Sequence, residues 1–139
     1  MFVGTFEHSL DDKGRVVLPA TFRAQLVEKG FLSQYDRCLG LWTEEGFSDM
    51  ADRLTEKVRD GLAPQEALRA FAAKAIEVRP DSQGRITIPQ RLRDFAALDH
   101  EVVVIGAINR IEIWNAGRWT DQSALADDSL TQAVTALGL

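Results

Sequence analysis

The sequence predicts an α+β protein built from two copies of one β-hairpin module, with helices between them. One motif occurs twice at a constant offset, each copy carries turn and strand signals, and the apolar residues between the copies recur at helical spacing. The 139 residues, of which 45% are hydrophobic, suffice for one compact domain or for two small, mutually dependent halves. This composition is too apolar for a disordered chain.

The internal repeat is the strongest of these signals. Residues 10–23 align with residues 80–93, so that position 15 corresponds to position 85, an offset of 70. Identical residues stand at five positions, and the apolar residues between them also match. Chance does not readily supply so many identities in register, so we interpret the chain as an internal duplication. The identical pairs are Asp11 with Asp81, Gly14 with Gly84, Arg15 with Arg85, Pro19 with Pro89 and Arg23 with Arg93.

Each copy begins with the signals of a β-hairpin. Aspartate suits the first turn position because its side chain bonds amides ahead of it, and glycine suits the last because it tolerates positive φ. The residues after the turn alternate between apolar and polar, which is typical of a half-buried strand. The expected elements are strands over 3–7 and 15–18 with a turn at 11–14, and strands over 75–79 and 85–88 with a turn at 81–84.

Helices and further strands follow each hairpin. Pro19 and Pro89 end the hairpin strands and can open short helices. Phe22 and Leu26 form the apolar face of the first helix, and its counterpart carries Leu92, Phe95 and Ala96. Two aromatic residues spaced five apart then occur in each copy, Trp42 with Phe47 and Trp114 with Trp119. The strands expected here lie near 37–42, 101–106 and 109–114.

The segment between the copies reads as two helices. An apolar stripe that includes Phe47 and Val58 ends near Gly61, and Pro64 can start a second helix. We interpret these stripes as core or subunit contacts. The residues after Ala126 give no clear structure signal. The predicted organisation is repeat 1 over 1–47, a helical connection over 48–74, repeat 2 over 75–121 and a C-terminal tail over 122–139.

Two copies in one chain also solve a stability problem. A module of about 45 residues buries too little apolar surface to be stable alone. Two modules can interleave their hairpins and close one β-barrel, which removes exposed strand edges. We therefore expect an intrachain barrel with pseudo-two-fold symmetry, in which the two Gly-Arg turns occupy related places.

Charge and cysteine content exclude several classes. The net charge of −5 argues against a generally basic nucleic-acid binder but leaves room for a local basic face. The single cysteine, Cys38, forms no intrachain disulfide and lies among apolar residues, so we expect a core residue in a reducing cytoplasm. The N-terminus lacks the basic start of a signal peptide, and the longest apolar run, 102–108, is far short of a membrane span.

These motifs resemble those of the MraZ family of bacterial transcriptional regulators, within the wider AbrB/SpoVT-like swapped-hairpin DNA-binding fold. The resemblance covers about residues 1–120 and is specific because the Asp-x-x-x-Arg motif occurs twice in matching settings. The residues that carry it are the opening Met1-Phe2-Val3-Gly4, Asp11 and Arg15 with Pro19 and Phe22-Arg23, Asp81 and Arg85 with Pro89 and Leu92-Arg93, and the stretch Gly106-x-x-x-Arg110-Ile111-Glu112-Ile113-Trp114 followed by Trp119.

The resemblance implies a fold, an activity and an assembly. The fold would be a swapped-hairpin β-barrel with intervening helices. The activity would be transcriptional control of the bacterial division and cell-wall gene cluster, beginning at the regulator's own promoter. The protein would act in the cytoplasm at the nucleoid, as a ring-like homo-oligomer on short direct repeats of double-stranded DNA. One protomer offers few cations, so several hairpins on repeated sites would gain affinity through effective concentration.

The repeated arginines are the expected DNA contacts. Arginine carries a planar fork of donors that fits both a phosphate and the O6/N7 edge of guanine. We expect Arg15 to be the principal contact and Arg85 its counterpart in the second copy. Lys13 is an expected phosphate contact, and since its counterpart Gln83 is neutral, the first copy should bind DNA more strongly.

Three further pairs complete the expected site. The turn glycines would let the backbone approach DNA closely. The second arginines of the motif would contact DNA or, alternatively, brace the turn aspartates. Phosphate repels carboxylates, so the aspartates are expected to hold the turn and orient the first arginines. The expected DNA-binding residues are Arg15, Lys13, Arg85, Gly14, Gly84, Arg23 and Arg93, and the turn-organising residues are Asp11 and Asp81.

Other interpretations remain open from the residues alone. Asp-Arg pairs in tight turns often only stabilise the turn, and exposed pairs contribute about 0–1 kcal/mol. An enzyme is not expected, because His8 and His100 lie in unlike contexts and no metal-ligand spacing occurs. We accordingly expect no cofactor, metal or small-molecule substrate. A protein-interaction module, such as the dimerising half of an antitoxin, is the alternative, although the tail over 124–139 is short and sparsely apolar for gripping a partner.

Overall fold

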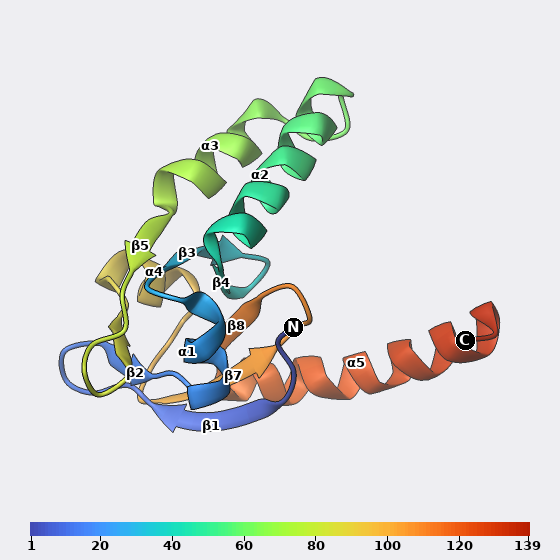
Figure 1. Ribbon diagram of the computed structural model, residues 1–139. Helices are drawn as coiled ribbons and strands as arrows, with labels where there is room; N and C mark the ends of the chain where they lie inside the picture. Colours follow the sequence, from blue (N-terminus) through green and yellow to red (C-terminus); the bar gives the residue numbers. More distant parts are fainter.

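The structure, a computed structural model, describes residues 1–139 and contains antiparallel sheets with helices around them (Figure 1). The α+β class predicted from the sequence is confirmed. The strands are β1 (Thr5–Ser9), β2 (Arg15–Val17), β3 (Gly30–Tyr35), β4 (Cys38–Trp42), β5 (Ile76–Val78), β6 (Arg85–Thr87), β7 (Glu101–Gly106) and β8 (Ile111–Asn115). The helices are α1 (Ala20–Leu26), α2 (Glu44–Arg59), α3 (Gln65–Lys74), α4 (Gln90–Phe95) and α5 (Ala116–Leu137).

The strands of the two copies interleave. Strand β1 of the first copy pairs with β7 of the second, and β5 of the second copy pairs with β3 of the first. The strands that follow the turns, β2 and β6, pair only with each other and form a separate two-stranded sheet. The other six strands form one sheet in the order β1-β7-β8-β4-β3-β5. This pairing describes two antiparallel sheets, so a closed barrel stays a prediction.

The register of these pairs follows a pseudo-two-fold axis. Val16 lies opposite Ile86 at the centre of the β2–β6 pair, and these two positions are equivalent in the repeat. The pairs on either side, Arg15 with Thr87 and Val17 with Arg85, exchange places under the same operation. Because strands of each copy pair with strands of the other copy, neither copy could form this sheet alone.

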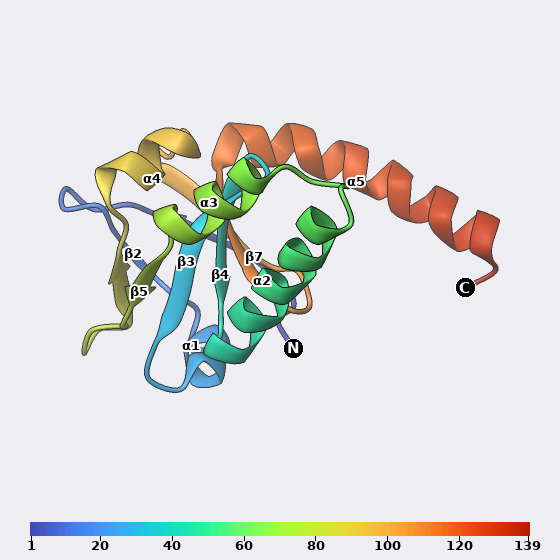
Figure 2. The same ribbon diagram turned by 90° about the horizontal axis from the view of Figure 1, so that it is seen from above.

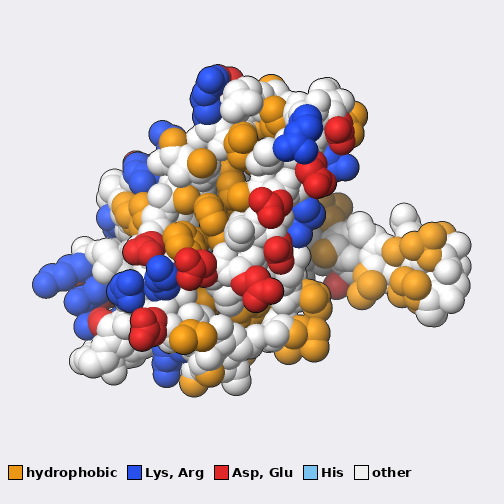
Figure 3. Space-filling view, turned by 45° about the horizontal axis from the view of Figure 1, so that its top comes forward, with side chains coloured by type: hydrophobic (Ala, Val, Ile, Leu, Met, Phe, Trp, Pro, Cys, Tyr) orange, Lys and Arg blue, Asp and Glu red, His pale blue; other side chains and the backbone are white.

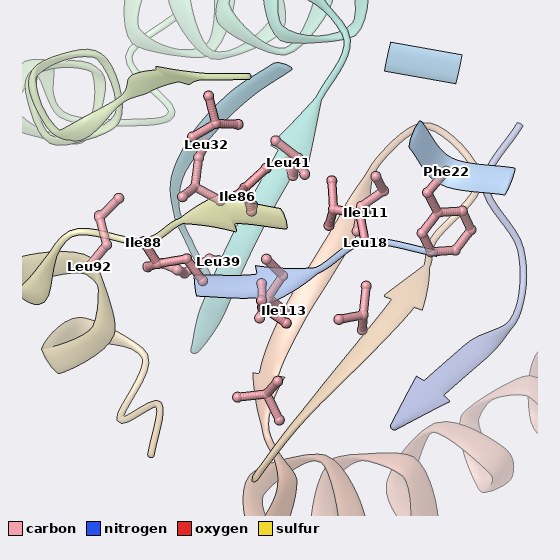
Figure 4. Packing of buried hydrophobic residues seen from close by; sticks show 14 of the residues in the cluster. Leu18, Phe22, Leu32, Leu39, Leu41, Ile86, Ile88, Leu92, Ile111 and Ile113 are labelled. Carbon is pink, nitrogen blue, oxygen red and sulfur yellow. The ribbon is translucent and has the colours of Figure 1, made fainter. Parts of the chain in front are cut away.

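The core lies between the β2–β6 pair and the larger sheet. Val16 and Ile86 are buried in the same cluster as residues of β3, β4 and β8. Figure 4 shows Ile86 of the pair beside Leu32 and Leu41 of the larger sheet. The repeated aromatic pairs are in contact after β4 and β8, with interplanar angles of 72° for Trp42 and Phe47 and 54° for Trp114 and Trp119. The ring centroids are 5.9 Å apart for Trp42 and Phe47, and 5.7 Å apart for Trp114 and Trp119. The residues labelled in Figure 4 are all fully buried: Leu18, Phe22, Leu32, Leu39, Leu41, Ile86, Ile88, Leu92, Ile111 and Ile113.

The opening residues dock on the β7–β8 turn. The amide of Phe2 donates to Ile108 O at 2.9 Å, Ile108 N donates back at the same distance, and Gly106 N donates to Gly4 O at 2.9 Å. A Cβ atom at position 106 would overlap the backbone of Phe2 and Val3. This close approach explains why a glycine at position 106 accompanies the Met-Phe-Val-Gly start of the chain.

The variant Gly106→Ala should therefore destabilise the fold. The added methyl group meets main-chain atoms that no side-chain rotation can move, so we expect the free energy of unfolding to fall by about 1–3 kcal/mol. Urea denaturation of the variant beside the wild type measures this difference. Gly117→Ala is the matched control, because the only close neighbour of its Cβ would be the Asn115 Oδ1 atom at 3.3 Å. Equal midpoints for wild type and Gly106→Ala would refute the packing argument.

Two elements differ from the sequence-based expectation. Strand β3 precedes the strand expected near 37–42 and forms a hairpin with it through Asp36, which has a positive φ of 54°. The tail without clear signals is the C-terminal part of helix α5, which continues through Leu137. Asn115 caps the start of α5 by accepting from Arg118 N at 2.9 Å, and Gly138 ends it in the left-handed conformation.

Helix α5 extends beyond the rest of the molecule (Figures 1 and 2). Its first turns pack on β7 and β8, while the distal turns project away from the sheets. None of the helices has the length and apolar character needed to cross a membrane. On the other side of the body, α2 and α3 form an antiparallel pair whose Phe47 and Phe71 rings stack at 4.9 Å.

Candidate nucleic-acid interface

The two turns have the same hydrogen-bond pattern. The Oδ1 atom of Asp11 accepts from the amides of Lys13 and Arg15, both at 2.9 Å. Its Oδ2 atom accepts from Arg15 Nε at 2.6 Å. Asp81 repeats this pattern, with Arg85 Nε at 2.8 Å. Each aspartate thus holds the turn and fixes the following guanidinium at the same time.

The fixed arginines keep free donor groups. Only Nε of Arg15 and of Arg85 is engaged, so the two terminal nitrogens of each guanidinium have no protein partner. The side chains are 28% and 26% exposed, respectively. A guanidinium anchored at Nε with its amino groups open is oriented before it meets a ligand, which reduces the entropy lost on binding.

The turn glycines make room for arginines of the other copy. A Cβ atom at Gly14 would meet the guanidinium carbon of Arg93 at 2.7 Å, and a Cβ atom at Gly84 would overlap the guanidinium of Arg23. Both glycines also have positive φ, 73° and 78°. These glycines are buried, so what comes close to their backbone in the structure is an arginine side chain.

The second arginines therefore do not brace the turn aspartates. Arg23 Nη1 donates to Leu18 O at 2.6 Å, and the Nε atom of Arg93 is buried without a hydrogen-bond partner. Neither arginine forms an ion pair with Asp11 or Asp81, since those carboxylates pair with the first arginines. The bracing alternative is thus replaced by a packing role, in which each arginine covers the turn glycine of the other copy.

The outward face of the β2–β6 pair lies between the two turns. We call this pair the ribbon, residues 14–18 and 84–88. Side chains alternate along it, with Val16 and Ile86 inward and Arg15, Val17, Arg85 and Thr87 outward. Val17 and Thr87 were not among the residues expected from the sequence. The period-2 pattern that places the arginines outward could have identified them, because each lies two residues after an arginine.

Basic side chains gather at this end of the molecule. Both turns lie at the left of Figures 1 and 2, and Lys and Arg side chains cluster at the left of the space-filling view in Figure 3. Lys13 and Gln83 are exposed at the two turns, with Asp12 beside Lys13 and Ser82 beside Gln83. The local charge is therefore carried mainly by arginines, whereas the whole chain has a net charge of −5.

The turn carboxylates are stabilised in their charged form. The hydrogen bond from the Arg15 amide, with smaller help from the Arg15 side chain and the Lys13 amide, lowers the pKa of Asp11. The hydrogen bond from the Arg85 amide lowers the pKa of Asp81 in the same way. Both aspartates remain ionised at neutral pH and keep the guanidinium groups in place.

Stability should depend on these two aspartates in acid. Their folded-state pKa values lie below the unfolded value of about 3.9, so their contribution is present at higher pH and is lost as the pH falls through the folded-state pKa. We expect the double variant Asp11→Asn and Asp81→Asn to show a flatter decline in unfolding free energy below about pH 5. Urea titrations across pH measure the decline. The double variant Asp127→Asn and Asp128→Asn, on α5, is the control. If the turn variant lost unfolding free energy in acid as steeply as the wild type, Asp11 and Asp81 would not be the source of the pH dependence.

The remaining reactive residue types lie away from the ribbon or are protected. Cys38 is buried, as expected, and donates to Tyr35 O at 3.0 Å. Burial raises the pKa of the Cys38 thiol, so the thiolate is not available at neutral pH. The structure contains no group of three or more His, Cys, Asp and Glu side chains arranged to hold a metal ion.

Comparison with known proteins assigns the chain to a family. Residues 1–65 and 71–138 match the family model described as "MraZ protein, putative antitoxin-like". A "Transcriptional regulator MraZ" from Clavibacter michiganensis subsp. michiganensis is 42% identical over 133 residues, covering 91% of this chain and 93% of the relative. Proteins of the same name from Kocuria rhizophila and Acetivibrio thermocellus are 43% and 36% identical, covering 86% and 100% of this chain and 84% and 100% of their own lengths.

Among solved structures, the solution structure of PHS018 from Pyrococcus horikoshii aligns with 81% of this chain and 88% of its own length, at a TM-score of 0.33 and 15% identity, which is too distant to support an argument. The sequence relatives, in contrast, match along nearly the whole length of the chain. This chain therefore belongs to the MraZ family, and the relatives that match it along nearly its whole length are named transcriptional regulators.

Proposed function

We propose that this protein regulates transcription by binding double-stranded DNA with the outer face of the ribbon. The observation that carries the proposal is the pair of anchored guanidinium groups, each held by an aspartate at Nε and open at its terminal nitrogens. A two-stranded β-ribbon fits the major groove of B-DNA, and an arginine fork can bond guanine O6 and N7 there. The family name of the relatives supports the same activity.

The ribbon would be a rigid DNA-binding surface. Its inward residues, Val16 and Ile86, are buried in the core, so the outward side chains stand on a fixed base. Arg15 and Arg85 are diagonal neighbours across the two strands, which places their Cα atoms roughly 7–8 Å apart. That spacing corresponds to about two base-pair steps. Arg23 and Arg93 would support the turns and add positive charge beside the DNA.

We also infer that the ribbon and the larger sheet close an intrachain swapped-hairpin barrel. Leu10 N donates to His100 O at 2.8 Å, beyond the last β1–β7 pair. Val16 and Ile86 share one core cluster with Leu39 and Ile113 of the larger sheet. A barrel would stiffen both turns against the force of DNA binding.

The DNA target follows from the family resemblance. We propose that the protein binds short direct repeats upstream of its own gene, in the division and cell-wall gene cluster, and acts in the cytoplasm at the nucleoid. Binding to a duplex from this upstream region, beside a shuffled duplex of equal length, tests the proposal. Preferential binding of the upstream duplex is expected. Equal binding of the two duplexes, or a stable complex with another protein and no DNA binding at low salt, would overturn it.

Lys13 is the proposed phosphate contact of the first turn. Its side chain is exposed and forms no ion pair, and Lys-phosphate contacts release condensed counterions. We expect Lys13→Ala to reduce the slope of log affinity against log salt by about 1, with little change in sequence preference. Titrations at several salt concentrations measure the slope. Lys57→Ala, on α2, is the control, and an unchanged slope in the Lys13 variant would remove this contact.

We further propose that copies of the chain assemble through α5, into a ring-like homo-oligomer. The side of the helix that meets Trp114 through Trp119 continues past the sheets as Ala126, Leu130, Val134 and Leu137, at helical spacing. Leu130 is 65% exposed. An apolar stripe of this length in water favours a partner surface. A head-to-tail contact between copies would close rings and present several ribbons to repeated DNA sites.

A further inference from the structure

The ribbon is symmetric in its arginines but not in the residues between them. Val17 lies opposite Arg85, and Thr87 lies opposite Arg15. These two residues occupy equivalent positions in the repeat, 17 and 87, and both point outward. The only outward residues of the paired strands are thus two identical arginines, one valine and one threonine.

The exposure of Val17 is unusual for its position. It is 38% exposed, whereas Val16 and Leu18 on either side are almost completely buried. The apolar run Val16-Val17-Leu18 therefore places one isopropyl group on the polar face of the ribbon. No core requirement explains this group, since the inner face is filled by the flanking residues. Thr87 keeps the same β-branched shape but adds a hydroxyl group.

The two arginines of the ribbon alone do not determine in which of two orientations the protein binds DNA. The turn hydrogen bonds that hold Arg15 and Arg85 are the same, so a half-turn about the Val16–Ile86 pair exchanges two equivalent guanidinium groups. DNA has its own two-fold axes perpendicular to the helix. A DNA-binding surface that consisted only of these two arginines would contact a site equally well in both orientations.

Val17 and Thr87 differ in what they offer a base pair. A valine side chain offers only methyl groups, which fit the thymine methyl in the major groove and cannot satisfy a polar base edge. A threonine offers a methyl group and a hydroxyl that both donates and accepts, so it tolerates several base edges. The two halves of the ribbon therefore favour different bases at positions related by the two-fold axis.

We propose that Val17 and Thr87 are specificity-determining residues that make each protomer bind a non-palindromic DNA site in one orientation. This inference rests on the proposed binding of DNA by the ribbon. The Val17 half selects a base pair with an exposed thymine methyl, and the Thr87 half is more tolerant. The arginines contribute affinity, while Val17 and Thr87 determine in which orientation the protomer binds its site.

Exchange of these two side chains tests the inference. Val17→Thr gives threonine in both halves, Thr87→Val gives valine in both, and the double variant exchanges them. Each protein selects duplexes from a pool with a randomised central segment, and the bound sequences are compared. Both single variants should select central sequences that are symmetric about the centre of the ribbon. In the double variant, the base preferences of the two central positions should change places. The preferences at the flanking bases should stay as in the wild type, because Lys13 and Gln83 are unchanged.

Affinity measurements give the size of the effect. We expect the wild type to lose about tenfold in affinity when the base pair under Val17 is changed, and Val17→Thr to lose much less. No charge changes, so the salt dependence should equal that of the wild type. Thr131→Val, on the distal part of α5, is the matched control for the same chemical change elsewhere.

The outcomes separate the inference from the proposed function. A wild type that binds no duplex, or binds all duplexes equally, would overturn the proposed function. A wild type that selects a sequence while all three variants select the same one would overturn the inference alone. Thermal melting verifies that the variants fold, and the outward position of both side chains predicts melting temperatures close to that of the wild type.

Discussion

Arg15→Ala is expected to reduce affinity for the preferred duplex by about 5- to 150-fold while the fold stays intact. That range corresponds to about 1–3 kcal/mol for a bidentate arginine contact with a base. The side chain belongs to neither core cluster, lies on the outward face of the ribbon and forms its one hydrogen bond with Asp11. Fluorescence anisotropy at one fixed salt concentration, on wild type and variant, measures the loss.

Two comparisons define the result. Arg85→Ala should also weaken binding, but less strongly, because Lys13 remains beside Arg15 in the first turn whereas the second turn has neutral Gln83. Arg59→Ala, an exposed arginine on α2 with no ion pair, removes the same charge far from the ribbon and should have little effect. If all three variants bound like the wild type, the arginines of the turns would serve only to stabilise them.

A second large effect is expected in the distal part of α5. Replacing Leu130 and Val134 with aspartate places two charges on the apolar stripe, and an interface between copies cannot bury unpaired charges. We expect the assembly to dissociate to smaller species. Affinity for a duplex with several repeats should fall by about 100-fold or more, since the advantage of multivalent binding is lost. Affinity for a single repeat should remain close to the wild-type value.

Sedimentation velocity and binding to single and repeated sites measure the two parts of this prediction. Gln132→Asp adds a charge to the opposite side of the same helix and is expected to leave assembly unchanged. Unaltered assembly in the double aspartate variant would show that α5 is not the contact. Dissociation without any loss on repeated sites would instead contradict the role of multivalency.

The sequence predicted the repeated elements well because their signals are local. The turn at Asp11 and its copy at Asp81 need only an aspartate, a glycine and an alternating strand, and both turns have the expected hydrogen bonds. The aromatic pair Trp42 and Phe47 also recurs as expected, with nearly equal centroid distances in the two copies. Periodicity over a few residues suffices for features of this kind.

Other features depend on contacts between distant residues. The packing of Arg23 against Gly84 crosses from one copy to the other, so no spacing within either motif reveals it. Strand β3 is stabilised by pairing on both sides, with β4 and β5, and its own sequence mixes apolar and polar residues without a clean period. The docking of Phe2 on the β7–β8 turn likewise brings together residues that lie far apart in the sequence, Phe2 and Ile108.

Helix α5 was not predicted beyond Ala126, although the sequence contains the signals of a helix there. Ala126, Leu130, Val134 and Leu137 recur at helical spacing, and Gly138 stands where a helix-ending glycine is expected. The stripe has the apolar pattern of a helix that packs in a core, but Leu130, Val134 and Leu137 are exposed and contact no core of this chain. Sequence patterns can indicate that such a helix forms, but the surface that covers it lies outside one copy of the chain.

Photo-crosslinking from the ribbon tests the central claim most directly. A photoreactive amino acid is placed at position 87, on the outward face of the ribbon, or at position 57 on α2, and each protein is irradiated with a labelled duplex from upstream of its gene. We expect a crosslink to DNA from position 87 and none from position 57. DNA crosslinked from position 57 but not from position 87 would contradict the assignment of the ribbon as the DNA-binding surface.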